Sequence, residues 1–173
     1  VLAHAKHRIA WLLILMFSAT ITGTIITRYE NAFAAIPLLV SFIPMLMDTG
    51  GNCGSQSSTL IIRGIALGEI QFSDLFRVMF KEFRVSLIVG VALALANGIR
   101  ILIMYKNAGL ALVIGLSLVA TIVISKLIGC VLPLIAKKLH MDPAIMASPL
   151  ITTLVDTCSI LIYFNIATQV FQL

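Results

Sequence analysis

Five apolar stretches, each long enough to cross a lipid bilayer as a helix, constrain this 173-residue chain more than any other feature. They are Ile9–Thr27, Ala32–Ile62, Val85–Met104, Gly109–Ile135 and Ala144–Phe171. A helix needs about 20 mostly apolar residues to cross the hydrocarbon core. Only helices and closed barrels satisfy every backbone polar group inside lipid. The sequence therefore predicts an all-α integral membrane protein with five transmembrane helices, in one membrane domain over residues 1–173.

The composition supports a membrane protein and argues against other classes. Apolar residues make up 60% of the chain and charged residues only 11%, whereas soluble domains have about a quarter charged residues. The formal net charge is +5, but the Lys and Arg residues stand at the ends of apolar stretches and form no basic run with aromatic residues. We therefore expect no nucleic-acid partner. The three cysteines form no CxxC pair, which speaks against a zinc site and a disulfide framework.

Positive charge is distributed unevenly between the two sides of the predicted membrane. Eight of the 12 Lys and Arg residues fall on one side, namely Lys6, Arg8, Arg63, Arg77, Lys81, Arg84, Lys137 and Lys138. The other side carries Arg28, Arg100 and Lys106. By the positive-inside rule, the sequence predicts a multi-pass plasma-membrane protein with a cytoplasmic N-terminus and an extracytoplasmic C-terminus.

Phenylalanine and other apolar residues recur at helical spacing over residues 72–84, with charged residues on the other faces. This pattern predicts a separate amphipathic helix on the cytoplasmic membrane surface, to which we assign no chemistry. Arg100 and Lys126 lie toward the ends of their stretches, so we expect both side chains to extend to the membrane surface. We expect Asn97 and Asn165 to form hydrogen bonds between helices.

Asp156 lies about fourteen residues into the last stretch, which puts it near the bilayer midplane at a rise of roughly 1.5 Å per residue. A carboxylate at that depth is costly unless a proton, an ion or a partner offsets its charge. Ser148 and Thr152 precede it at intervals of four, so their hydroxyl groups share its helix face. We interpret these residues as part of an ion site.

A second polar series interrupts the second stretch. Asp48, Asn52 and Gln56 recur at intervals of four and share one face if the helix continues through the glycines among them. The glycines serve either close helix packing or a distortion beside a water-filled cavity. Asp142 lies in the loop before the last stretch, where it is suited to cap that helix or to contribute at the inner mouth of a pore.

Carboxylate, amide and hydroxyl oxygens suit hard divalent cations. Mg²⁺ keeps several waters and takes only one or two carboxylates, which matches a sparse acidic site in a wet pore. Mn²⁺, Co²⁺ and Ca²⁺ use overlapping oxygen ligands and could take its place. A single Asp156 balances a doubly charged ion poorly, whereas a twofold dimer supplies two. We therefore expect a homodimer with its pore near the dimer interface.

At these residues the chain resembles the MgtE family of magnesium channels, over essentially its whole length. The matching runs are Gly51–Thr59, Ile62–Ile70, Asp142–Ala144, Ser148–Asp156 and Ile162–Phe164. The resemblance implies a homodimeric Mg²⁺ channel, not an enzyme, in which Asp156 holds a hydrated ion with help from neighbouring polar and backbone groups. It also implies cytoplasmic regulatory domains, a pair of CBS domains among them. We expect these outside this chain, which begins with Val1 rather than Met.

Three other functions fit the sequence less well. A cation-coupled secondary transporter of divalent metals would also use a midplane carboxylate, but no inverted repeat of interrupted spans is evident. An intramembrane aspartyl protease is suggested by Asp48-Thr49-Gly50, yet Val155 stands where a Gly would precede the second Asp. A structural anchor would not need the polar series around Asp48 and Asp156. Passage of Mg²⁺ down its electrochemical gradient is the function we expect.

Overall fold

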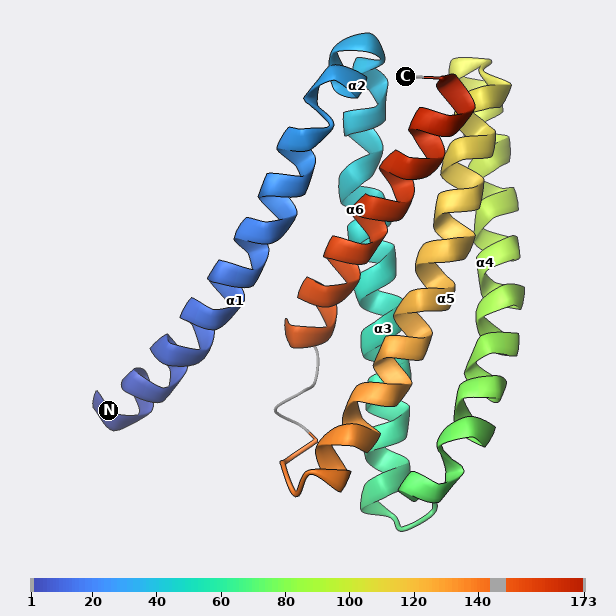
Figure 1. Cartoon of the computed structure of the whole chain (residues 1–173). Helices are drawn as coiled ribbons and strands as arrows, with labels where there is room; N and C mark the ends of the chain where they lie inside the picture. Colours follow the sequence, from blue (N-terminus) through green and yellow to red (C-terminus); the bar gives the residue numbers. More distant parts are fainter. Residues whose placement is uncertain (1, 144–148, 173) are drawn as a thin grey trace.

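Long helices that alternate in direction make up the structure, a computed structural model that describes residues 2–143 and 149–172 (Figure 1). The α-helices are α1 (Leu2–Arg28), α2 (Glu30–Ala35), α3 (Ile43–Ala66), α4 (Leu75–Tyr105), α5 (Ala108–Lys138) and α6 (Pro149–Phe171), and the 3₁₀ helices are η1 (Pro37–Phe42) and η2 (Phe72–Asp74). The described residues contain no strand. The predicted all-α class is confirmed.

Three of the helices, α4, α5 and α6, are long and apolar enough to cross a membrane. The apolar part of α1 is shorter, Leu12–Arg28, and α3 carries the polar series that begins at Asp48. Figure 1 shows the N-terminus and the α3–α4 connection at one end of the bundle, and the α1–α2 connection and the C-terminus at the other. Five alternating passes would produce this arrangement, while the orientation in the membrane stays a prediction.

The second predicted stretch is divided at Pro37, not at its glycines. Ile36 is extended, with φ −136° and ψ 81°, and Pro37 begins η1. Proline lacks a backbone N–H and disfavours a helical residue before it, so α2 ends here. From Ile43 onward α3 is one continuous helix through its glycines. Asp48, Asn52 and Gln56 therefore share a helix face, as the sequence predicts.

The predicted surface helix over residues 72–84 is not separate from the third stretch. After η2, α4 runs without a break from Leu75 to Tyr105. No Gly or Pro lies between Leu75 and Val89, so nothing in the sequence ends the helix at residue 84. Phe76 and Phe80, 81% and 64% exposed, form an open aromatic face at its start.

Two apolar clusters and a polar layer between them form the interior. One cluster joins Leu39 and Leu46 to Tyr163 and Phe164, and the tyrosine hydroxyl donates a 2.8 Å hydrogen bond to the Leu39 carbonyl. The other cluster contains Ile61, Val78, Cys130 and Leu134. The layer between them is buried and consists of small or polar residues: Gly50, Gly54, Ser57, Ser58, Glu82, Thr121, Ser125, Lys126 and Gly129.

Helices α3 and α5 come almost into backbone contact at Gly54 and Gly129. A Cβ atom added to Gly129 would lie 3.0 Å from the carbonyl carbon of Gly54 and 3.1 Å from its Cα. A Cβ added to Gly54 would lie 3.2 Å from the Ser125 carbonyl oxygen. Small residues allow such close packing between membrane helices, where little else drives association.

Candidate cation site

A polar pocket of about 220 Å³ lies between α3 and α6. Its lining residues are Met47, Asp48, Gly51 and Asn52 from α3, and Thr152 and Asp156 from α6. Asp156 is half-buried, while Asp48 and Asn52 are exposed on the outside of the single chain. The pocket thus brings together four of the seven residues predicted for the site.

Gly51 explains why the two polar series meet. A Cβ atom at this position would lie 3.0 Å from Cγ2 of Thr152, so only a glycine lets α3 approach α6 this closely. The adjacent Gly50 faces Val155 of α6 and Thr121 of α5, each 2.8 Å from an added Cβ. Gly50 and Gly51 therefore bring α3 close to α6 between Asp48 and Asn52, beside the turn that carries Thr152 and Asp156.

The pocket presents oxygen atoms that can accept hydrogen bonds from water or bind a cation. The Asn52 amide nitrogen donates to Oδ2 of Asp48 at 3.1 Å, which holds that carboxylate and leaves the amide oxygen available. The Thr152 hydroxyl donates to the Pro149 carbonyl at 2.9 Å, so its remaining lone pairs are acceptors. With Asp48 and Asp156, one chain contributes two carboxylates.

The size and composition of the pocket suit a hydrated ion. Six waters at about 30 Å³ each occupy about 180 Å³, less than the volume of the pocket. The described residues contain no group of three or more His, Cys, Asp or Glu side chains that would enclose a dehydrated metal. This sparse donor set matches Mg²⁺, which gives up its waters reluctantly.

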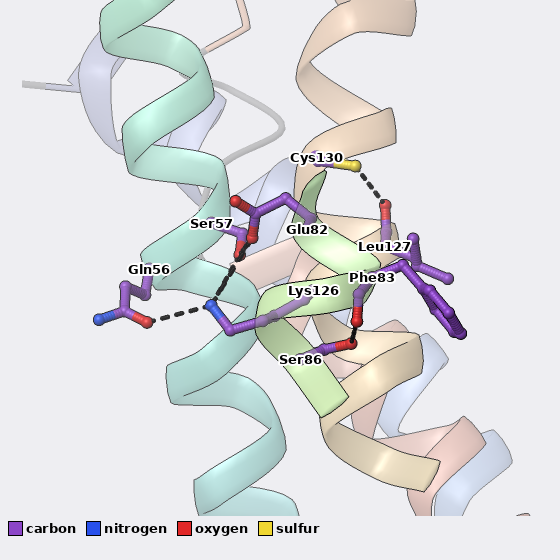
Figure 2. A network of polar contacts seen from close by, with 8 residues as sticks. All are labelled: Gln56, Ser57, Glu82, Phe83, Ser86, Lys126, Leu127 and Cys130. Atoms are coloured by element: carbon purple, nitrogen blue, oxygen red, sulfur yellow. Dashed lines mark hydrogen bonds and ion pairs between the residues drawn. The ribbon is translucent and has the colours of Figure 1, made fainter. Parts of the chain in front are cut away.

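Gln56, the third residue of the predicted α3 series, does not line this pocket. Its side-chain oxygen accepts a 3.2 Å hydrogen bond from Nζ of Lys126, which turns that oxygen toward α5 (Figure 2). Lys126 also does not extend to the membrane surface, because only 2% of it is exposed and it pairs with Glu82 at 3.6 Å. A buried carboxylate nearby offers the ammonium group an alternative to water.

The two asparagines predicted to bond between helices bond within their own helices instead. The side-chain oxygen of Asn97 accepts from Nε of Arg100 at 2.9 Å. The amide of Asn165 donates to the Leu161 carbonyl at 2.7 Å. Both partners lie three or four residues away, a separation at which helical side chains meet without a second helix.

Two predicted site residues remain, and the pocket does not account for either of them. Asp142 follows α5 and is not among the residues that line the pocket. Ser148 lies outside the described residues. Met47 and Gly51 line the pocket but were not predicted as part of the site. Gly51 stands between two predicted ligands, so its small size was a signal that another helix packs closely at the site.

Known proteins match this chain over a region that includes the pocket residues. The family model MgtE, described as a divalent cation transporter, matches residues 43–166. The magnesium transporter MgtE of Bacillus subtilis (strain 168) is 40% identical over 95% of this chain and 36% of its own length. The proteins of the same name from Thermus thermophilus and Enterococcus faecalis are 36% and 34% identical over 92% and 95% of the chain, and 35% and 36% of their own lengths. The chain spans about a third of these relatives.

Proposed function

The chain belongs to the MgtE family of divalent cation transporters, and from this membership we propose that it forms a homodimeric, Mg²⁺-selective channel. The observation that carries the proposal is the pocket in which Asp48 and Asp156 meet from two helices. Relatives named as magnesium transporters support Mg²⁺ as the transported ion. Mn²⁺, Co²⁺ and Ca²⁺ bind similar oxygen ligands and are its competitors.

The exposed face of α3 supports a second copy. Polar residues follow one another along this face, namely Asp48, Asn52, Gln56, Thr59 and Arg63. Lipid cannot solvate such a face, so we propose that it borders a water-filled path closed by the partner chain. A twofold axis beside α3 and α6 would bring two copies of Asp156 to one ion path. The orientation with the N-terminus in the cytoplasm, and the passage of α1 and α3 through the membrane, are parts of this proposal.

In the proposed mechanism, hydrated Mg²⁺ enters from outside and is attracted by the paired Asp156 carboxylates. Some of its waters are exchanged for protein oxygens such as those of Asn52 and Thr152, and the ion then descends its electrochemical gradient. No chemical bond is broken. The protein contributes fixed charge and oriented oxygen atoms at the place where the ion sheds part of its hydration.

Mg²⁺ uptake into proteoliposomes tests the proposal directly. We expect uptake that follows the Mg²⁺ gradient and the membrane potential, measured with an internal Mg²⁺ dye. The lumenal pH should be recorded in the same vesicles, because proton movement coupled to each Mg²⁺ would indicate a secondary transporter. Vesicles that take up no more Mg²⁺ than protein-free vesicles would contradict the proposed function.

Cross-linking tests the dimer interface. In a background with Cys53, Cys130 and Cys158 replaced by Ala, we expect Thr59→Cys to be joined into a covalent dimer by a short bis-maleimide. Thr59 is exposed on the polar face of α3, which we place beside the twofold axis. Ile103→Cys is the matched control, since Ile103 is 72% exposed on α4, away from that face. Equal cross-linking at both positions, or cross-linking of Ile103→Cys alone, would contradict this interface.

A further inference from the structure

An ion pair lies in the buried polar layer and connects three helices (Figure 2). The Lys126 ammonium of α5 is 3.6 Å from Oε2 of Glu82 on α4, with side chains 3% and 9% exposed. Ser57 of α3 stands between them, because its hydroxyl donates to Glu82 at 2.6 Å and accepts from Lys126 at 3.2 Å.

Stability alone does not account for this pair. Removing two charges from water is costly, and well-packed apolar residues of similar volume often serve a fold as well or better. The pair also lies outside the pocket that holds Asp48 and Asp156.

A third partner of Lys126, Gln56, lies on the face of α3 that we assign to the ion path. The Lys126 ammonium donates to the side-chain oxygen of Gln56 at 3.2 Å, and Gln56 is exposed on the polar face of α3. Gln56 follows Asn52 by four residues, which corresponds to about 6 Å along the helix. The positive charge of Lys126 thus lies directly behind the face that we assign to the ion path.

A lone ammonium group in that place would repel a divalent cation. The repulsion is strong where low-dielectric protein and lipid replace bulk water. The carboxylate of Glu82 cancels most of this repulsion, and the Ser57 hydroxyl holds the two charged groups next to each other. The amide of Gln56 meanwhile turns its oxygen toward α5, so it offers a cation no direct ligand.

We propose that Glu82 and Lys126 are positioning residues for Mg²⁺ passage. Lys126 orients Gln56 on the pore face, and Glu82 neutralises Lys126 so that the path beside Gln56 stays open to a divalent ion. This inference rests on the proposed Mg²⁺ conduction. It goes beyond that function because it assigns a role to residues that do not line the pocket.

Four proteins test the inference in one proteoliposome assay: the unchanged chain, Glu82→Gln, Glu82→Gln with Lys126→Gln, and Glu82→Gln with Gln56→Glu. Glu82→Gln leaves one uncompensated positive charge, and we expect Mg²⁺ uptake per folded protein to fall by at least about tenfold. The neutral double variant should recover uptake to within about threefold of the unchanged chain, because it removes both charges. Gln56→Glu should also restore uptake, since it places a carboxylate beside Lys126 from the other side.

A binding measurement separates electrostatics from folding. Mg²⁺ that binds the folded state raises the melting temperature. We expect Glu82→Gln to need more Mg²⁺ for the same rise, and both double variants to respond like the unchanged chain. Glu69→Gln is the matched control, because Glu69 is exposed and lies outside the ion pair, so its loss should change neither measurement.

Each outcome decides the inference. Normal uptake by Glu82→Gln would overturn it while the proposed channel stands. Equal loss in Glu82→Gln and both double variants would assign the pair to folding and overturn it as well. If Glu82→Gln does not fold, the neutral double variant decides, because its uptake supports the inference and its inactivity overturns it. An unchanged chain that neither binds nor passes Mg²⁺ would overturn the proposed function and the inference together.

Discussion

Asp156→Asn is expected to lower Mg²⁺ uptake into proteoliposomes by at least about hundredfold. The substitution keeps the size of the side chain and removes its charge. At an effective dielectric constant of about 20, two unit charges 5 Å apart interact by about 3 kcal/mol, and the ion carries two charges. A dimer loses one carboxylate from each chain, so its ion path loses the attraction that offsets partial dehydration.

A matched control is Asp74→Asn, which makes the same chemical change outside the pocket. Asp74 accepts a 3.0 Å hydrogen bond from the backbone N–H of Gln71, and an asparagine oxygen can still accept it. We expect its uptake to equal that of the unchanged chain. Unchanged uptake in Asp156→Asn, with a loss in Asp48→Asn, would instead place the main ion site at Asp48 and Asn52.

Gly129→Ala is expected to be the most destabilising single methyl addition in the bundle. The new Cβ would overlap the backbone of Gly54, and backbone atoms cannot turn aside as a flexible side chain can. Helices α3 and α5 must then separate and lose close contacts along their crossing. Overpacking commonly costs 1–3 kcal/mol and occasionally more, so we expect about 3 kcal/mol or more. For a chain of this size, this lowers the melting temperature by about 6–12 °C.

Gly98→Ala provides the control, because an added Cβ at that position has no atom within 4 Å beyond its chain neighbours and the backbone of its own helix. Alanine is favoured over glycine inside a helix by about 0.5–1 kcal/mol, so this variant should melt at the same or a slightly higher temperature. Both variants can be compared by thermal unfolding in one detergent. Equal melting temperatures for the two would show that the Gly54–Gly129 contact is looser than the structure has it.

Much of the site follows from the sequence because helical spacing is a local property. Asp48 and Asn52 share a face of one helix, and Thr152 and Asp156 share a face of another, wherever those helices pack. Their meeting in one pocket depends on which helices become neighbours. That pairing is set by contacts such as Gly51 against Thr152, between residues about a hundred positions apart, which the spacing of residues does not reveal.

The buried ion pair shows a second limit. A lysine within a membrane helix can reach water with its long side chain or pair with a carboxylate. Which of these Lys126 does depends on the position of Glu82. The prediction ended a separate surface helix at residue 84 and placed Glu82 in that helix. Once α4 is continuous from Leu75, Glu82 enters the bundle and Lys126 has a partner. The wrong helix boundary and the wrong prediction for Lys126 therefore have one cause.

The glycines of α3 also bear on how such a protein can diversify. Gly50, Gly51 and Gly54 seat this helix against its neighbours largely through backbone atoms, while its exposed polar side chains take little part in that contact. Substitutions at Asn52 or Thr59 would then leave the packing of the helix largely unchanged. If the proposed ion path follows the exposed face, its selectivity would be open to change there, whereas the glycine side, where an added Cβ lies 2.7–3.0 Å from neighbouring side chains, would not accept larger residues.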